Sequence, residues 1–225
     1  TTDNDAYHDI PGGPVQHDHT GVALYTTIFS FEESPLTQGE LWAGTDDGRV
    51  HISTNDGESW TEITPINMPR EGTVNTLDLS THQKGRCVMT VYKYRDGDSR
   101  PYVFLTNDYG KNWKLLTDGN NGIPADHFVR VVREDPDRLG LLYAGTEFGM
   151  FISFNEGESW EPFQLNLPHT PITDMLVYRN DLVISTQGRS FWILDEISPL
   201  HDEGFGKNGN QAYLFSTRNA YRTQM

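Results

Sequence analysis

Short stretches in which apolar and polar residues alternate recur along this chain, separated by glycine, asparagine, aspartate and proline. Runs such as VMTV, VRVV and LVIS are rich in β-branched residues. A two-residue period bounded by turn formers is typical of β-strands. We identify no convincing helical stretch, so the pattern predicts an all-β protein.

The predicted strands group into four units of four strands each. Their ranges are 23–31, 40–45, 49–53 and 59–64 in the first unit, 74–80, 88–94, 102–106 and 112–116 in the second, 128–134, 141–146, 150–153 and 159–165 in the third, and 172–178, 181–186, 190–194 and 212–216 in the fourth. A polar, glycine-rich loop at 198–211 precedes the last of these strands.

One eight-residue pattern, which we call the box, occurs three times. It reads STNDGESW at 53–60, TNDYGKNW at 106–113 and SFNEGESW at 153–160, and its tryptophans are 53 and 47 residues apart. A recurrence at that spacing is typical of repeat architectures, most often propeller blades. The fourth unit, LVISTQGRSFWIL at 182–194, lacks the box and has Asp195 and Glu196 in its place.

We interpret each box as the hairpin turn between the third and fourth strands of a blade. Its glycine supplies a positive φ, and its Asn or Asp accepts hydrogen bonds from turn N–H groups. Its tryptophan packs between adjacent blades and buries on the order of 200 Å². Two boxes have Asn where chemistry would need an acid, so the box is structural. The residues given this role are Ser53, Asn55, Gly57, Trp60, Thr106, Asp108, Gly110, Trp113, Ser153, Asn155, Gly157 and Trp160.

Four four-stranded blades form a β-propeller or part of one, because propellers close with about 4 to 8 blades. A closed four-blade ring and an arc of a larger ring both satisfy the pattern. In an arc, further blades would cover the exposed sheet edge. We expect an extended N-terminal segment at 1–21, blades within 22–217 (about 22–65, 73–117, 127–165 and 172–217) and a tail at 218–225.

Composition narrows the class of partner. The net charge of −15 over 225 residues repels nucleic acid and anionic membrane surfaces. No apolar run approaches the roughly 18 residues that span a bilayer, which argues against membrane insertion. Cys87, the single cysteine, excludes an internal disulfide and lies in a strand as a small apolar residue. The start TTDNDAY, without Met or a signal peptide, suggests a mature product or a piece of a longer chain.

The strand order places candidate chemistry on one face of the blades. Turns between second and third strands share a face with the blade-to-blade connections, and the boxes lie on the other. We call the first the connection face and the second the box face. The candidate catalytic residues on the connection face are Asp46, Asp47 and Glu147, and the candidate substrate-binding residues are His19, His127, His169 and Arg189.

Three interpretations of the connection face remain open. A carboxylate pair separated by roughly 5 to 9.5 Å would suit glycoside hydrolysis. His17, Asp18 and His19 could hold a metal, but no third ligand is identifiable, so we expect none. The face could also be a binding surface without chemistry. Nucleophilic triads, phosphate loops and dinucleotide fingerprints are absent from the sequence, and we expect no cofactor.

The boxes match the Asp-box, or bacterial neuraminidase repeat, with the pattern Ser/Thr-x-Asp-x-Gly-x-Thr/Ser-Trp. Together with GGPVQHDHTG, LWAGTDDGRVHIS, PADHFVRVVREDP, LYAGTEFGMFIS and FWILDEISPL, they make the chain resemble bacterial glycosyl-hydrolase-like proteins related in fold to sortilins and xyloglucanases. The resemblance implies a secreted or periplasmic protein with seven or more blades, of which this chain is an arc. The remaining blades would then be its partners.

The resemblance does not carry a particular activity. Sialidases need an arginine triad and an Arg-Ile-Pro segment, and no such segment is present here. The cysteine-rich module of sortilins is missing, and no position can be assigned to the catalytic aspartates of xyloglucanases. We therefore predict a propeller portion that binds carbohydrate and is a candidate for hydrolysing it. The alternatives are a sortilin-like propeller that binds a peptide or protein, and a non-catalytic assembly scaffold.

Overall fold

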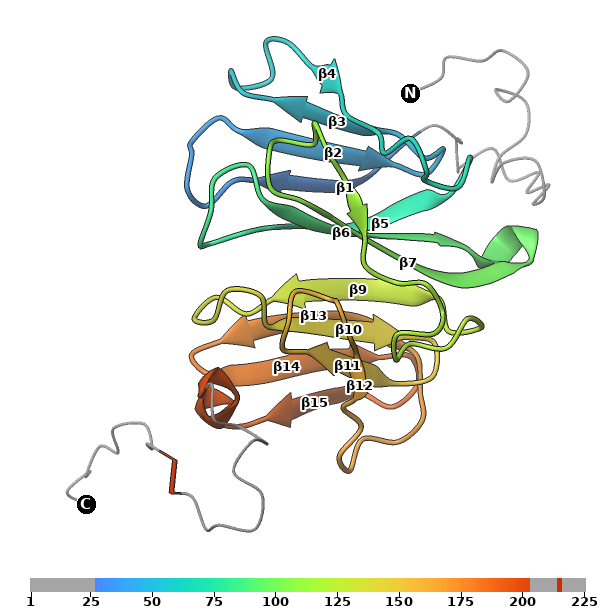
Figure 1. Cartoon of the computed structure of the whole chain (residues 1–225), viewed down its shortest axis with the longest axis vertical. Helices are drawn as coiled ribbons and strands as arrows, with labels where there is room; N and C mark the ends of the chain where they lie inside the picture. Colours follow the sequence, from blue (N-terminus) through green and yellow to red (C-terminus); the bar gives the residue numbers. More distant parts are fainter. Residues whose placement is uncertain (1–26, 203–213, 216–225) are drawn as a thin grey trace.

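The computed structural model describes residues 27–202 and 214–215. Within them the chain forms fifteen strands in four antiparallel sheets, with two short 3-10 helices (Figure 1). No helix in this part of the chain is long and apolar enough to cross a bilayer. The predicted segment at 1–21, the tail at 218–225 and residues His17, Asp18 and His19 lie outside the described residues.

Each sheet is one blade, with its strands in chain order. Blade 1 contains β1 (Ile28–Glu33), β2 (Leu41–Thr45), β3 (Val50–Ser53) and β4 (Thr61–Glu62). Blade 2 contains β5 (Thr73–Leu79), β6 (Cys87–Lys93), β7 (Asp98–Thr106) and β8 (Lys114–Leu115), with helix η1 (Tyr94–Asp96) between β6 and β7. Blade 3 contains β9 (Val129–Glu134), β10 (Leu142–Thr146), β11 (Met150–Ser153) and β12 (Glu161–Pro162). Blade 4 contains β13 (Ile172–Tyr178), β14 (Asp181–Thr186) and β15 (Phe191–Leu194), followed by η2 (Ser198–His201).

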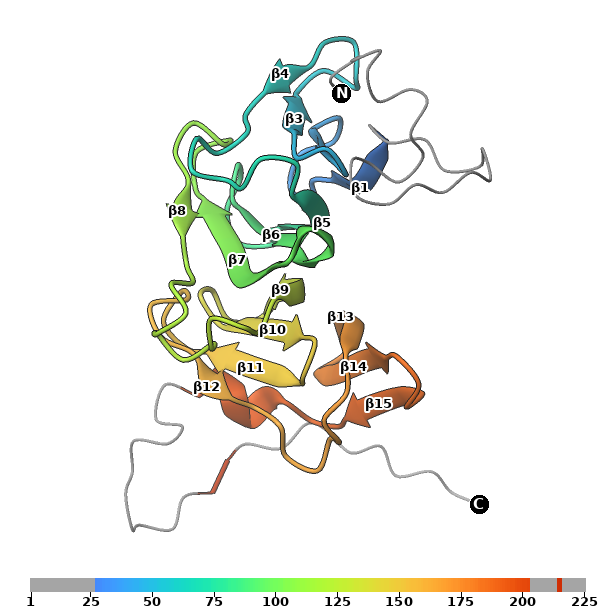
Figure 2. The same ribbon diagram turned by 90° about the vertical axis from the view of Figure 1, so that its right-hand side faces the viewer.

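The blades follow one another along the chain, with β5 packed against β1 and β9, and β9 against β13 (Figures 1 and 2). A glycine in the second strand permits this approach at two boundaries. A Cβ on Gly44 would lie 2.3 Å from Cγ1 of Val74 in blade 2, and one on Gly145 would lie 2.6 Å from Cγ2 of Ile172 in blade 4. The AGT element of the repeat is thus the surface that receives the next blade.

The box turns have the predicted geometry. In blade 1, Ser53 Oγ accepts a hydrogen bond from the N–H of Gly57 at 2.9 Å, and Asn55 Oδ1 accepts one from Ser59 at 3.0 Å. The boxes of blades 2 and 3 repeat both bonds. The glycines have φ of 83°, 76° and 78° in chain order, which confirms the positive φ expected at this position.

The box tryptophans join neighbouring blades. Trp113 Nε1 donates to the carbonyl of Ile63 in blade 1 at 2.8 Å, and Trp160 Nε1 donates to that of Leu116 in blade 2 at 3.1 Å. Trp60, for which the described chain contains no preceding blade, is 41% exposed, whereas Trp160 is 3% exposed. The indole therefore acts between blades, as the sequence predicted.

The fourth strands are shorter than predicted, with two paired residues each. In blade 1, the N–H of Ile63 still donates to the carbonyl of Val50, but the N–H of Val50 donates to the side chain of Thr64. Blades 2 and 3 repeat this arrangement. Because a side-chain oxygen replaces the next backbone partner, the ladder ends there.

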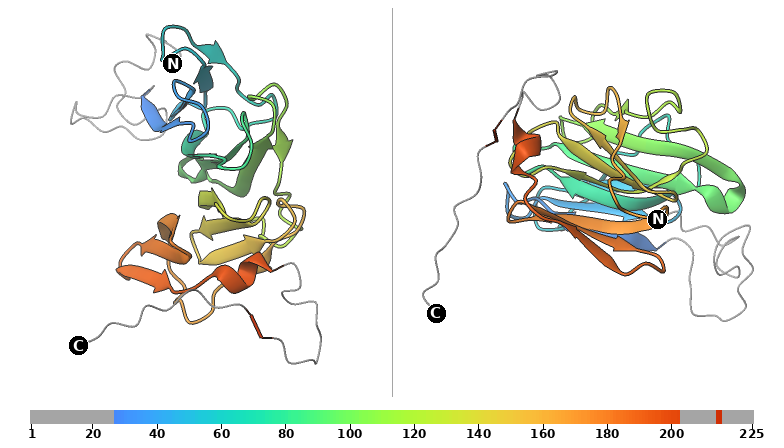
Figure 3. Two further views of the ribbon diagram at one scale, coloured as in Figure 1. Left: turned by 90° about the vertical axis from the view of Figure 1, so that its left-hand side faces the viewer. Right: turned by 90° about the horizontal axis from the view of Figure 1, so that it is seen from below.

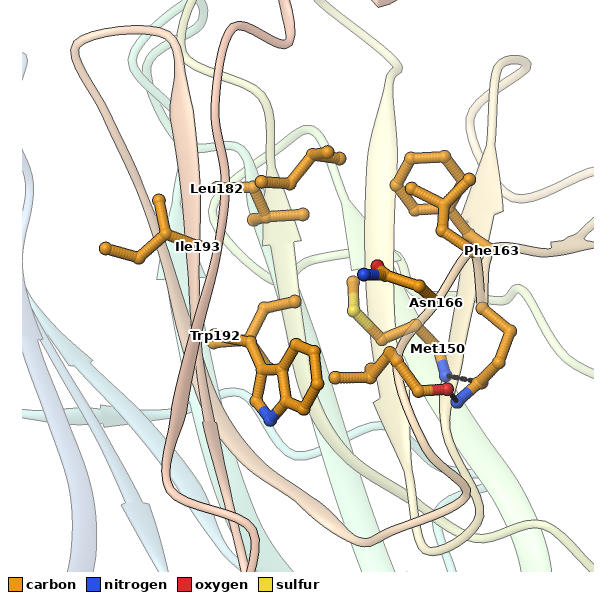
Figure 4. Close-up of a pocket in the computed structure, with 11 residues that line it drawn as sticks. Met150, Phe163, Asn166, Leu182, Trp192 and Ile193 are labelled. Atoms are coloured by element: carbon orange, nitrogen blue, oxygen red, sulfur yellow. Dashed lines mark hydrogen bonds between the residues drawn. The ribbon is translucent and has the colours of Figure 1, made fainter.

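Blade 4 has three strands in the described part of the chain instead of four. Of the strand predicted at 212–216, only Leu214 and Phe215 are described, and neither is in a strand. A mainly apolar pocket lies between blades 3 and 4 (Figure 4). Met150, Phe163, Leu182 and Trp192 are among the residues that line it.

Among the described residues, no further blade covers either end of the arc, and we call these the bare ends. At the blade 1 end, Ile28, Phe29, Phe31 and Trp60 are 41 to 60% exposed. At the blade 4 end, the exposed apolar residues are Leu176, Tyr178, Phe191 and Ile193. Figure 2 and the left view of Figure 3 show blades 1 and 4 at opposite ends of the molecule. The chain is thus an open arc and not a closed four-blade ring.

Candidate functional site

A repeated backbone hydrogen bond holds the turns of the connection face. The N–H groups of Asp46, Glu147 and Gln187 donate to the carbonyls of Thr27, Phe128 and Pro171, which directly precede the innermost strands. These bonds occur in blades 1, 3 and 4. The turns between second and third strands therefore lie beside the blade connections, as the strand order predicted.

The two candidate aspartates of blade 1 accept hydrogen bonds from nearby threonines. Asp46 accepts hydrogen bonds from the N–H and hydroxyl of Thr27, at 2.8 and 3.2 Å. Asp47 is 8% exposed and accepts one from the hydroxyl of Thr45. These contacts give both carboxylates a role in shaping the turn between β2 and β3.

Glu147 lies two blades away from Asp46 and is paired with an arginine. Its Oε2 is 2.8 Å from Nε and 2.7 Å from Nη2 of Arg130. The Arg130 guanidinium also lies over the rings of Phe128 and Tyr94, with centroid distances of 5.0 and 5.4 Å. Arg130 thus joins the only candidate acid of blade 3 to an aromatic group that spans blades 2 and 3.

That aromatic group, which we call the Tyr94 cluster, consists of Tyr92, Tyr94, Phe128, Arg130 and Glu147. Tyr94 stacks on Phe128 at 4.4 Å with an interplanar angle of 12°, and Tyr92 lies 5.1 Å from Tyr94. Burial raises the pKa of Tyr92 above its usual value. Helix η1, between β6 and β7, begins at Tyr94 and places this ring beside blade 3.

Two of the candidate histidines lie on the same face beside the cluster. His127 packs at 4.6 Å on the ring of Phe148, and its Nδ1 is 2.8 Å from Asp126. His169 Nδ1 is 3.1 Å from the carbonyl of Phe148. Phe148 therefore contacts His127 of blade 3 through its exposed ring and His169 through its backbone carbonyl.

Arg189 is exposed in the β14–β15 turn, where its carbonyl accepts the Trp192 Nε1 hydrogen bond at 2.9 Å. The structure thus gathers His127, His169 and Glu147 near Phe128 and Phe148. It places Asp46 and Asp47 in blade 1 and Arg189 on a separate turn of blade 4. Sequence reasoning missed Tyr94, Phe128 and Arg130, because each reads as part of an ordinary strand or turn.

A second charged group lies where the innermost strands meet. Arg133 of blade 3 contacts Asp78 of blade 2 at 3.3 Å and Asp174 of blade 4 at 3.0 Å. Burial raises the pKa of Asp78 to about 6, against the lowering effect of Arg133. Burial also raises the pKa of Glu32 in blade 1. One guanidinium thus links the charges of successive blades.

One group of side chains has the composition of a metal site: Asp135, Asp137 and His201. Asp135 is buried, and its carboxylate already accepts hydrogen bonds from the hydroxyl of Tyr143 and from the N–H groups of Asp137 and Arg138. His201 Nε2 is 3.0 Å from it. The contacts instead explain how η2 is fixed to the β9–β10 turn.

No protein-family model matches the chain, and no curated protein matches it. Solved structures match at 14% identity. YCF48 bound to D1 peptide has a TM-score of 0.56 over 76% of this chain and 52% of that chain. The GH74 xyloglucanase from Xanthomonas campestris has a TM-score of 0.55 over 74% of this chain and 29% of that chain. The extracellular domain of a hybrid two-component system from B. thetaiotaomicron has a TM-score of 0.54 over 74% of this chain and 21% of that chain.

The chain therefore spans about half of the YCF48 structure and less than a third of the other two. At this identity the likeness concerns the fold alone. Together with the four sheets and the bare ends, it shows that the chain is an open arc of a β-propeller, similar in fold to xyloglucanase and YCF48 propellers.

Proposed function

We propose that this chain is part of a secreted or periplasmic propeller that binds carbohydrate on its connection face, at the Tyr94 cluster. The observation that carries the proposal is the Arg130–Glu147 ion pair stacked on Tyr94 and Phe128. Ligand sites combine apolar and aromatic surface with a few placed polar groups. A sugar ring offers both an apolar face and hydroxyl groups to such a surface. The likeness to an extracellular domain supports the location.

Hydrolysis of the bound carbohydrate is a further step beyond this proposal. Glu147 would be the acid nearest the ligand, and Asp46 or Asp47 would have to act from blade 1. The carboxylate of Glu147 already accepts hydrogen bonds from Arg130, and a carboxylate oxygen is a suitable acceptor for sugar hydroxyls. Binding therefore has more support than catalysis.

A binding assay with soluble neutral polysaccharides would test the proposal. Tyr94→Ala removes the stacked ring and should weaken binding by up to about tenfold, since a contact with an aromatic ring contributes about 0.5 to 1.5 kcal/mol. Tyr178→Ala, at an exposed tyrosine of blade 4, is the matched control and should leave affinity unchanged. Equal affinities for the two variants would contradict the proposal.

A peptide ligand is the second candidate, favoured by the aromatic surface that Tyr92, Tyr94 and Phe128 share. A peptide pull-down beside the polysaccharide assay separates the two. Release of reducing sugar, lost in Glu147→Gln, would extend the function to hydrolysis. Binding of peptides but of no polysaccharide would replace the carbohydrate proposal with the sortilin-like one.

A further inference from the structure

A second pocket, of about 400 Å³, opens on the box face at the boundary between blades 2 and 3. We call it the rim pocket. It is lined by Leu105, Asn107, Asp108, Asn112, Trp113, Lys114 and Glu156. Its volume lies in the range of small-ligand sites, roughly 300 to 1,000 Å³. Nothing in the Tyr94 cluster contributes to it.

A buried arginine contacts two side chains in the wall of the rim pocket. Arg86, with 1% of its side chain exposed, pairs with Glu134 at 2.6 Å. Its Nη1 also donates to Asn107 Oδ1 at 2.7 Å and forms an ion pair with Glu156 Oε1 at 3.1 Å. A buried guanidinium thus fixes two of the polar side chains in the wall, one from each blade.

The wall of the rim pocket has both hydrogen-bond donors and acceptors available for a ligand. Asn107 uses its Oδ1 on Arg86, which leaves its amide N–H groups as donors, and nothing among the described residues bonds the Nζ of Lys114. Asn112 donates its amide to Asp108 at 2.6 Å, which leaves its Oδ1 as an acceptor. The side chain of Glu156 is 48% exposed and keeps Oε2 as a second acceptor. A hydroxyl group both donates and accepts, so a polyhydroxylated ligand matches this wall.

The charge of the lining favours a neutral ligand. Asp108 and Glu156 would repel an anion, and Lys114 would repel a cation. The hydrogen bonds from Asn112 hold the pKa of Asp108 below its usual value, so this carboxylate stays ionised. The half-buried Trp113 and the buried Leu105 add apolar surface.

Blade 2 alone has this set of side chains. At the positions of Asn107, Asn112 and Lys114, blade 1 has Thr54, Ser59 and Thr61, and blade 3 has Phe154, Ser159 and Glu161. The box turn does not require these particular side chains, because the backbone N–H at the seventh box position bonds the Asn or Asp side chain in all three blades. We infer that the rim pocket is a binding site for a neutral sugar residue of a glycan, separate from the connection face.

The experiment uses the full chain labelled with ¹⁵N and a panel of neutral tetrasaccharides: β-1,4- and β-1,3-linked glucose, β-1,4-linked mannose and β-1,4-linked N-acetylglucosamine. At least one should shift the amide signals of Asn107 and Asn112. Lys114→Thr copies blade 1, and Asn107→Asp keeps the acceptor for Arg86. Each should weaken binding by about tenfold, the loss expected for one or two hydrogen bonds.

Lys111→Thr is the matched control, because Lys111 lies in the same turn outside the pocket, and it should bind like the parent chain. Tyr94→Ala should also leave this binding intact, so the inference stands or falls independently of the proposed function. Three results would overturn it: no tetrasaccharide shifts the rim-pocket amides, Lys111→Thr loses as much affinity as Lys114→Thr, or the shifts lie only in the Tyr94 cluster.

Discussion

Replacing the box tryptophan by alanine should lower the free energy of unfolding more in blade 3 than in blade 1. Full burial of an indole removes roughly 200 Å² from water, which at about 25 cal/mol per Å² corresponds to about 5 kcal/mol. Trp160 is 3% exposed and donates to the carbonyl of Leu116, so Trp160→Ala should cost about 5 kcal/mol. Trp60 is 41% exposed, and its smaller buried area reduces the cost of Trp60→Ala to about 3 kcal/mol.

Urea unfolding followed by far-UV circular dichroism measures both losses. If Trp160→Ala does not fold, Trp160→Phe keeps most of the apolar area and should still lose about 1 kcal/mol with the hydrogen bond. Equal losses for Trp60→Ala and Trp160→Ala would refute the reasoning, because they would mean that the indole stabilises its own turn and not the contact between blades.

Three further substitutions test other parts of the structure by the same unfolding assay. Gly122→Ala should cost about 3 kcal/mol or more, because its Cβ would lie 1.8 Å from the carbonyl oxygen of the blade 3 tryptophan, whereas Gly97→Ala, in open space at φ 81°, should cost about 1 kcal/mol. Asp78→Asn should stabilise the chain by about 2 kcal/mol more at pH 7 than at pH 4, because the parent loses stability as pH rises from 3.8 through about 6. Asn55→Asp should change stability by less than about 0.5 kcal/mol, whereas Ser53→Ala should cost about 1 to 3 kcal/mol, since it leaves a buried turn N–H without an acceptor.

The blades could be predicted from the sequence because each box turn is determined by residues that are close together in the chain. Each box contains within eight residues the serine or threonine, the Asn or Asp, the glycine and the tryptophan that form one turn. The short fourth strands could not be predicted, since the side chain of Thr64 competes with a backbone partner on another strand. An alternating pattern does not record such competition.

The candidate site was predicted only in part because its contacts join different blades. Glu147, His127 and His169 were identified from their turns. Tyr94 and Phe128 are 34 residues apart, and Arg130 looks like an ordinary strand residue within VRVV. Only the packing of blade 2 on blade 3 brings these side chains together, and no periodicity in the chain encodes that contact.

The bare ends of the arc give any self-association a direction. The blade 1 end carries Phe31 and Trp60, while the blade 4 end carries Tyr178 and Phe191, so the two surfaces are unlike each other. Contacts between unlike surfaces are head-to-tail, and they either close into a ring or grow into a filament. The rotation between successive blades would decide which occurs. Any contact between two copies through these surfaces would therefore join the blade 4 end of one copy to the blade 1 end of the other, in one orientation.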